Sequence, residues 1–221
     1  MPAGLIIDTA SPCIGIAAFD GAGQLVYRWS QRIVAGADGV LSPALAGAVR
    51  ALGPGDFAIG AVIGPGAFTG VRVGLSHALG LAEARGSGLI PINALLLRAA
   101  PWHGFASVLA LLDAKKGRVY AQRFDVRERI PVALDEACDI DPAALDFPRY
   151  TLATGEGAEV YRSLLLDRDA LVAHDAAESV LARVGALLTL PAVDPAAVRP
   201  LYVREPDAKP PVLSGVTLVQ S

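Results

Sequence analysis

The chain has 221 residues, of which 53% are hydrophobic and 19% charged, and its net charge at pH 7 is −3. This composition excludes an intrinsically disordered chain, which combines low hydrophobicity with high net charge. The slightly acidic balance gives no electrostatic signal for independent binding of nucleic acid. The two cysteines exclude a disulfide scaffold and a CxxC metal cage.

Membrane and export signals are absent from the sequence. No apolar run reaches the roughly 20 residues that a membrane helix needs, and the first residues lack the basic segment of a signal peptide. We therefore expect a cytoplasmic chain without a membrane partner.

The first part of the chain predicts an α/β unit with a mixed sheet. Apolar runs separated by glycine and proline indicate its elements. They are strands at 5–7, 14–19 and 24–33, a helix at 40–52, a strand at 57–63, a loop at 64–70, a helix at 71–85, a strand at 89–92 and a helix at 94–100. The first helix starts either with Ser42 as N-cap and Pro43 as first helical residue, or at Asp38 with Pro43 inside it.

The second part restarts a similar pattern. We expect strands at 105–112, 118–124, 131–138 and 150–153, a loop at 139–148, a helix after Gly157 that ends near 166, and a helix at 176–190. In both parts a strand ending in Asp, at Asp8 and at Asp113, is followed by a hairpin. Two such halves are typical of actin-like and sugar-kinase-like ATPases. The predicted division is 1–102, 103–198 and a tail at 199–221.

A phosphate-loop-like set of residues follows two of the predicted strands. Ligands in open α/β sheets sit off strand ends, where a carboxylate can hold a metal-bound water; an Asp after a strand can equally start a turn. Glycines before a helix allow close backbone approach to an anion, although the spacing matches neither Walker A nor GxGxxG and a structural turn fits as well. The set is Asp8, Thr9, Gly64, Gly66, Thr69 and Gly70.

The helices at 40–52 and 71–85 are apolar on more than one stripe. A helix that covers a sheet needs a single apolar stripe, so either the chain's own second half or a partner chain covers the rest. We favour the partner. The residues predicted for that interface are Leu41, Leu45, Val49, Leu52, Val71, Leu75, Ala78, Leu79 and Ala82.

Other catalytic signals are missing. The histidines His77, His103 and His174 form no HxxxH or HExxH pair, so no metal site is expected. No serine or cysteine has a nucleophile motif. The segment Asp113–Arg118 places three cations after a strand, which favours a solvated hairpin turn over a basic rim for an RNA backbone.

Four motifs in this order resemble the bacterial TsaB family, also called YeaZ. They are Asp8-Thr9-Ala10-Ser11, the block from Gly64 to Gly74, the block from Leu112 to Tyr120, and Pro200-Leu201-Tyr202-Val203-Arg204. The match covers nearly the whole chain. It implies an α/β, actin-like ATPase (ASKHA) fold of two RNase H-like lobes, with a reduced second lobe and the partner-binding helices on the first.

The resemblance also implies a function. A TsaB-like chain is a non-catalytic scaffold in the complex that installs N6-threonylcarbamoyladenosine next to the anticodon of tRNAs reading codons that start with A. Its partners are a TsaD-like catalytic, metal-binding paralogue, which forms the heterodimer, and a TsaE-like ATPase; tRNA is the substrate of the complex. Without TsaD two alternatives stay open: a homodimer through the same surface, or a monomer.

No cofactor is expected on this chain alone, and ATP or ADP is placed at the interface of the complex. The alternative function is that of a stand-alone small ATPase or sugar-kinase-like phosphotransferase. It would use Asp8 and the loop from Gly64 to Gly70.

Overall fold

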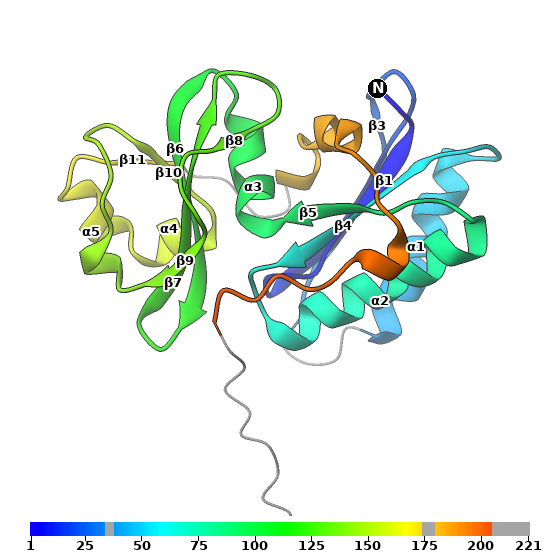
Figure 1. Cartoon of the computed structure of the whole chain (residues 1–221), viewed down its shortest axis with the longest axis horizontal. Helices are drawn as coiled ribbons and strands as arrows, with labels where there is room; N and C mark the ends of the chain where they lie inside the picture. Colours follow the sequence, from blue (N-terminus) through cyan, green and yellow to red (C-terminus); the bar gives the residue numbers. More distant parts are fainter. Residues whose placement is uncertain (34–37, 174–179, 205–221) are drawn as a thin grey trace, which may run out of the picture.

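The computed structural model describes residues 1–33, 38–173 and 180–204. Their elements form a mixed α/β structure with two β-sheets (Figure 1). Most of the predicted tail and the start of the helix predicted at 176–190 lie outside the described residues. Within the described part, no helix is both long and apolar enough to cross a membrane.

The first sheet has the mixed pairing that the sequence predicts. Its strands are β1 (Gly4–Asp8), β2 (Cys13–Phe19), β3 (Leu25–Arg32), β4 (Ala58–Gly64) and β5 (Ile90–Asn93), in the order β3-β2-β1-β4-β5. The first three strands form an antiparallel meander, and β4 and β5 add in parallel on the other side of β1. Strand β1 is buried on both faces, which explains its continuous apolar run.

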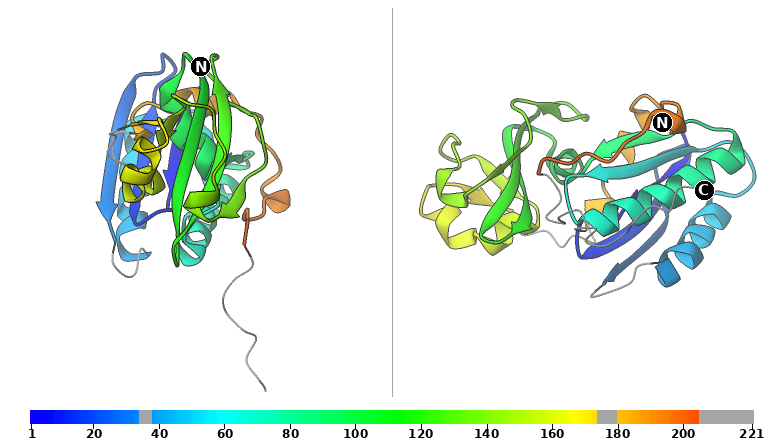
Figure 2. Two further views of the ribbon diagram at one scale, coloured as in Figure 1. Left: turned by 90° about the vertical axis from the view of Figure 1, so that its left-hand side faces the viewer. Right: turned by 60° about the horizontal axis from the view of Figure 1, so that its bottom comes forward.

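Helices cover both faces of this sheet. The helices α1 (Asp38–Leu52) and α2 (Phe68–Arg85) lie side by side on one face (Figure 2). Leu5 and Ile7 point into that core, whereas Ile6 points into the opposite core, which contains residues of α3 (Ala94–Ala99). This alternation follows the two-residue period of a strand.

Two helix starts decide between sequence alternatives. Helix α1 begins at Asp38 and carries Pro43 inside it, so the second alternative is confirmed. Helix α2 begins at Phe68, so the loop predicted at 64–70 is wrong for its last three residues. Thr69 and Gly70 belong to the first turn of α2. A glycine is tolerated inside a helix, and it often has a packing reason there.

The second sheet repeats the strand order of the first. Its strands are β6 (Phe105–Lys115), β7 (Arg118–Val126), β8 (Val132–Ala133), β9 (Cys138–Ile140), β10 (Leu152–Thr154) and β11 (Leu171–Val172). The order β8-β7-β6-β10-β11 parallels β3-β2-β1-β4-β5, and β9 adds to β7. In both sheets a hairpin strand pairs in parallel with a strand much later in the sequence. The internal repeat predicted from the strand–Asp pattern therefore extends to the topology.

Three predicted elements of the second part are wrong in continuity. The strand at 131–138 is two short strands, β8 and β9, separated by an irregular segment. The helix that ends near 166 is α4 (Glu156–Val160) and α5 (Arg162–Leu166), interrupted at Tyr161, whose φ is −107° and ψ 25°. In the described part of the helix at 176–190, a turn precedes the 3-10 helix η3 (Gly185–Thr189). Helical periodicity indicates a helical region, but it does not reveal single residues that leave the helical conformation.

The last described residues return to the first sheet. Leu89 and Val193 exchange backbone hydrogen bonds of 3.0 and 2.9 Å, and η3 packs on β1 and β4. The predicted division places η3 and Val193 in the second domain, although both contact the first sheet or the residue that precedes β5. The boundary at 102 falls between the 3-10 helix η1 (Ala100–Trp102) and β6, and as a domain division it stays a prediction.

Candidate functional site

The end of β1 holds the first predicted site residues in a fully buried position. Asp8 is 2% exposed and Thr9 1%. The Oδ1 atom of Asp8 accepts a hydrogen bond of 3.0 Å from the backbone N–H of Ala10, and Oδ2 accepts one of 2.6 Å from Nη1 of Arg98. Both carboxylate oxygens of Asp8 therefore have a partner within the chain.

Arg98 connects the two sheets through this carboxylate. It lies in α3 and is 1% exposed. Its Nε and Nη2 donate to the two carboxylate oxygens of Glu156, at the start of α4, over 3.2 and 3.0 Å, and Nη2 also reaches the hydroxyl of Ser11 at 3.4 Å. The planar guanidinium is suited to such two-pronged contact with carboxylates. We call Asp8, Ser11, Arg98 and Glu156 the Arg98 cluster.

The electrostatics favour the charged forms of Arg98 and Glu156. Burial by itself would lower the pKa of Arg98, but the charges of Asp8 and Glu156 raise it above its ordinary value. Burial by itself would raise the pKa of Glu156, but the charge and hydrogen bonds of Arg98 outweigh it and hold that pKa below its usual range. Arg98 thus forms an ion pair with Asp8 and another with Glu156.

The predicted glycine loop packs directly on the end of β1. A Cβ atom at Gly66 would overlap the carbonyl oxygen of Ala10, and one at Gly70 would overlap that of Thr9. The hydroxyl of Thr9 donates to the carbonyl of Gly70 over 2.8 Å. Gly64 has a φ of +113° and lies against the carbonyl of Leu201. These glycines are required because two backbone segments touch here, and a ligand is not needed to explain them.

The second half uses the same packing at its equivalent junction. Gly155, with a φ of +91°, lies against the carbonyl of Leu111, and Gly157 against the backbone of Leu111 and Leu112. Both glycines flank Glu156 of the Arg98 cluster. The structure therefore brings together Asp8 and Thr9 with the glycine block and adds the carboxylate of Glu156 from the start of α4.

The nine predicted interface residues separate into two groups. Leu41, Val71, Leu75, Ala78 and Ala82 are at most 4% exposed. These five side chains of α1 and α2 point into the chain's own core, where a partner cannot contact them. The prediction that they form the partner interface is therefore wrong. The remaining residues are half-buried: Leu45, Val49, Leu52 and Leu79. For these four, contact with a partner stays a prediction.

The outward surface of α1 and α2 has many short side chains. Its exposed positions include Ser42, Pro43, Ala46, Ser76 and Gly80, and longer charged residues are exposed at Arg50, Arg72, Glu83 and Arg85. The two helices are joined at this surface by a 3.0 Å hydrogen bond between Ser42 Oγ and Nε2 of His77, whose Nδ1 lies 2.9 Å from the carbonyl of Val73. Short side chains allow a facing helix to approach closely.

Metal-binding clusters are not found in the described ranges. No group of three or more His, Cys, Asp or Glu side chains converges in residues 1–33, 38–173 and 180–204. His77 contacts Ser42, His103 is an exposed residue after η1, and His174 lies outside these ranges.

Sequence reasoning missed Arg98 and Glu156. Arg98 stands in the apolar run from Ala94 to Ala100, and an arginine in a helix that is otherwise apolar was the one available signal. A fully buried arginine is rare unless it is paired. Nothing in the sequence indicated Glu156 as its partner, because 58 residues separate the two.

Comparison with known proteins agrees with these features. A family model described as TsaD, tRNA N6-adenosine threonylcarbamoyltransferase, matches residues 56–193, more than half of the chain. The TsaB protein of Escherichia coli is 43% identical over 60 residues, 26% of either chain. The chain belongs to the TsaD family, and within it to the TsaB (YeaZ) group.

Two longer matches each cover more than 90% of this chain. YeaZ from Pseudomonas aeruginosa has the same fold, with a TM-score of 0.77 and 22% identity over 91% of this chain and 100% of the other. An uncharacterized protein of Mycobacterium leprae is 29% identical over 219 residues, which is 93% of this chain and 56% of the relative. The TsaB-like chain spans 56 to 64% of the length of the curated mycobacterial relatives that it matches.

Proposed function

We propose that this TsaB-like chain is a non-catalytic subunit in the synthesis of threonylcarbamoyladenosine on tRNA. The observation that carries the proposal is the Arg98 cluster. A phosphotransferase needs a carboxylate that is free to hold a metal-bound water or a nucleophile. Asp8 is buried and both of its oxygens are engaged by Ala10 and Arg98. The position that an ATPase would use is occupied by an internal ion pair.

The substrate class follows from the family. The matching family model is described as a tRNA N6-adenosine threonylcarbamoyltransferase, and the Escherichia coli relative as a tRNA threonylcarbamoyladenosine biosynthesis protein. The equal strand order of the two sheets supports assigning them to the two lobes of an actin-like ATPase fold. We place the complex in the cytoplasm.

The outward surface of α1 and α2 is the surface we assign to a TsaD-like paralogue. It combines short exposed side chains with the half-buried Leu45, Val49, Leu52 and Leu79. Helix pairs of this kind pack against a second pair with interaxial distances of about 8–10 Å. Without the paralogue, a second copy of this chain would cover the same helices. The TsaE-like ATPase would join the heterodimer.

The competing function is a stand-alone ATPase or phosphotransferase. It requires the Arg98 cluster to open so that Asp8 and the residues after β4 can meet a nucleotide. Breaking a buried ion pair costs about 3–5 kcal/mol, so this function is disfavoured. In the proposed function, ATP or ADP binds only at the junction with the paralogue.

A reconstitution with one component omitted tests the proposal. The TsaD-like and TsaE-like proteins and the enzyme that supplies threonylcarbamoyl-adenylate are incubated with ATP, threonine, bicarbonate and unmodified tRNA, with or without this chain. Product is expected only when the chain is present. The conservative variant Asp8→Asn, which removes the charge that catalysis would need, is expected to support product formation if it folds.

Two results would overturn the proposal. One is product formation that does not change when the chain is omitted. The other is ATP hydrolysis by the chain alone that disappears in the folded Asp8→Asn variant, which would assign the chemistry to Asp8.

A further inference from the structure

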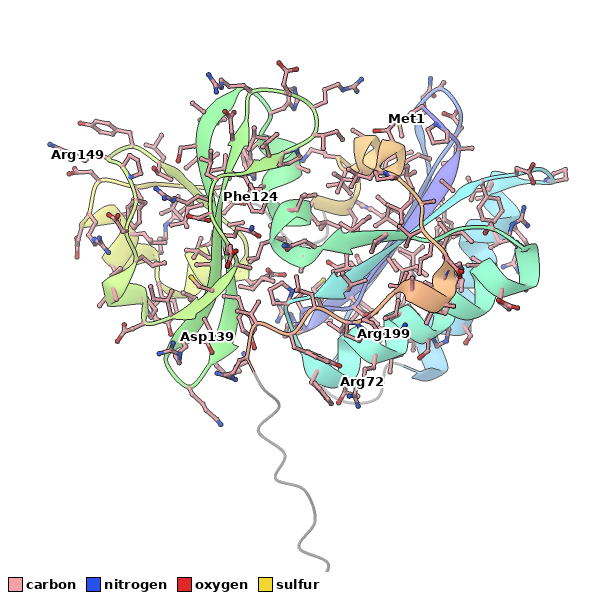
Figure 3. The ribbon with its side chains drawn as sticks, in the orientation of Figure 1. Met1, Arg72, Phe124, Asp139, Arg149 and Arg199 are labelled. Atoms are coloured by element: carbon pink, nitrogen blue, oxygen red, sulfur yellow. The ribbon has the colours of Figure 1, made fainter. Side chains whose placement is uncertain are left out.

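The buried core between the two sheets contains side chains from both halves of the chain. One cluster of apolar side chains includes Ile6 and Phe19 of the first sheet together with Leu112 and Phe124 of the second. Each of these four side chains is at most 3% exposed. Figure 3 shows Phe124 towards the middle of the molecule, whereas Arg149 lies at its outer edge. The two sheets therefore share a core at the place where they meet.

Helix α3 lies inside this shared core. Its residues Leu95 and Leu97 belong to the same cluster, and the helix packs on β4 and β5 of the first sheet as well as on β6 and β7 of the second. Figure 1 shows α3 between the two sheets. Two units of one chain are expected to move relative to each other unless their interface is large and hydrophobic. Here the interface is a buried apolar core, so its burial opposes separation of the sheets.

The start of α3 is bonded to the second sheet by the residue that caps the helix. The Oδ1 atom of Asn93 accepts from the backbone N–H groups of Leu95 and Leu96 over 2.7 and 3.4 Å. Its Nδ2 atom donates to Oε1 of Gln122 in β7 over 2.9 Å, and Gln122 is buried. One side chain thus caps the helix and bonds the opposite sheet.

The residues after α3 contact the second sheet as well. The Nε1 atom of Trp102 in η1 donates to Oγ1 of Thr154, the last residue of β10, over 2.9 Å. Thr154 is 1% exposed. Between the two ends of this segment, Arg98 holds Glu156. We call the pairs Asn93–Gln122, Arg98–Glu156 and Trp102–Thr154 the junction contacts.

Arg98 lies between the carboxyl ends of two strands that belong to different sheets. Strand β1 ends at Asp8, and β10 ends at Thr154, shortly before Glu156. Ligands of open α/β sheets bind outside the carboxyl ends of strands. At this junction the guanidinium of Arg98 lies 2.6 Å from the carboxylate of Asp8 and 3.0 Å from that of Glu156. The chain's own cation thus connects the two strand ends.

We propose that α3 and the junction contacts hold the two sheets in one fixed relative orientation, which a nucleotide does not change. Separation of the sheets would expose Leu112 and Phe124 to water and would take Glu156 away from its cation; both changes are unfavourable. The outward surface of α1 and α2 therefore keeps a constant position relative to α4 and α5. This inference rests on the contacts described above and does not depend on the proposed function.

The distance between spin labels on the two halves tests the orientation. The labels are attached to Glu83→Cys on α2 and Ser163→Cys on α5, two exposed positions, in a full chain that also carries Cys13→Ser and Cys138→Ser. Pulsed electron paramagnetic resonance gives the distance distribution with and without Mg-ATP. One narrow distribution with the same mean is expected in both samples. Two separate distances, or a mean that shifts when Mg-ATP is added, would overturn the proposal.

A matched pair of double variants tests the junction contacts. Thr154→Val/Glu156→Gln removes the acceptor of Trp102 and the charge that Arg98 holds. The control Thr151→Val/Glu159→Gln makes the same two changes at the buried Thr151, whose hydroxyl lies 3.4 Å from that of Ser107 within the second half, and at the exposed Glu159.

The junction variant is expected to widen the distance distribution about twofold, because released units move as hinged bodies. The control is expected to keep the width of the labelled parent chain. Equal widths in the junction variant and the control would reject the junction contacts as the cause of the fixed orientation. Circular dichroism checks that both variants are folded; if the junction variant is not, the response of the labelled parent chain to Mg-ATP still decides.

Hydrogen exchange in increasing urea tests the shared core without any substitution. The backbone amides of β4 in the first sheet and of β6 in the second are expected to lose protection at the same urea concentration, because a shared core unfolds as one cooperative unit. If β6 loses protection at a urea concentration at which β4 is still protected, the two halves unfold independently and the proposal fails.

These measurements are independent of the reconstitution that tests the proposed function. A chain with one fixed distance that is not needed for product formation retains this inference and loses the proposed function. A chain that is needed for product formation, but whose labels change their distance with Mg-ATP, retains the proposed function and loses this inference.

Discussion

The Nη1 atom of Arg98 lies 2.6 Å from Oδ2 of Asp8, although 90 residues separate the two in the sequence. The same guanidinium holds Glu156 at the start of α4, which packs on β6 of the second sheet. One buried cation thus joins the end of β1, α3 and the start of α4. It also engages one oxygen of Asp8, the carboxylate that the competing ATPase function would need free.

Removal of the Arg98 cation should strongly destabilise the chain. Arg98→Met keeps much of the side-chain volume but leaves Asp8 buried without its partner. Breaking a buried ion pair in this way costs about 3–5 kcal/mol. Urea denaturation followed by circular dichroism measures the free energy of unfolding. Arg98→Lys is the matched variant; it should lose less, because the charge remains but the two-pronged contact does not.

The same cluster predicts a loss of stability in acid. The pKa of Glu156 is below its ordinary value of 4.5 in the folded chain, so folding favours its ionised form. This contribution is complete above pH 4.5 and is lost as pH falls through the lower folded value. Glu156→Gln should flatten the pH dependence of the free energy of unfolding below the ordinary pKa of 4.5, where the contribution of the carboxylate is lost. An identical slope in both proteins would contradict the role of Glu156.

Two glycines of α2 should respond to alanine in opposite directions. At Gly74 a Cβ atom would overlap the hydroxyl oxygen of Thr9, whereas at Gly80 it would meet no atom within 4 Å. Gly74→Ala should therefore destabilise the chain by about 1–3 kcal/mol. Gly80→Ala should stabilise it by about 0.5–1 kcal/mol, because alanine favours the helix. Thermal unfolding measures the change in Tm of each variant relative to the wild type. Equal changes in Tm would mean that Thr9 does not constrain α2.

Core and surface positions of α1 and α2 should separate folding from partner binding. Leu75 is 4% exposed, so Leu75→Glu is expected to unfold the chain. Leu45→Glu and Leu79→Glu, at half-buried positions, should remain folded and lose co-purification with the TsaD-like protein. Val160→Glu places the same charge at a residue that is 59% exposed on α4, and serves as the control. Retained co-purification of both folded variants would reject this surface as the interface.

The sequence alone was sufficient for the elements with strong periodicity or clear punctuation. The three antiparallel strands, the two long helices and the repeat of a strand ending near an aspartate are all found in the structure. The motifs also identified the family. The sequence did not reveal the helix breaks near Tyr161 or before η3, because short elements depend on contacts that a local pattern does not contain.

Only the tertiary structure decided what the conspicuous residues do. The sequence shows that the helices at 40–52 and 71–85 are unusually apolar, but burial divides Leu75 from Leu45. It shows glycines at 64, 66 and 70, but their reason is the backbone of Thr9, Ala10 and Leu201, which approaches from distant segments. Local composition determines strands and helices because propensity and burial pattern act over a few residues. Charge pairing and close contact depend on distance in space, so the Arg98 cluster exists only in the folded chain.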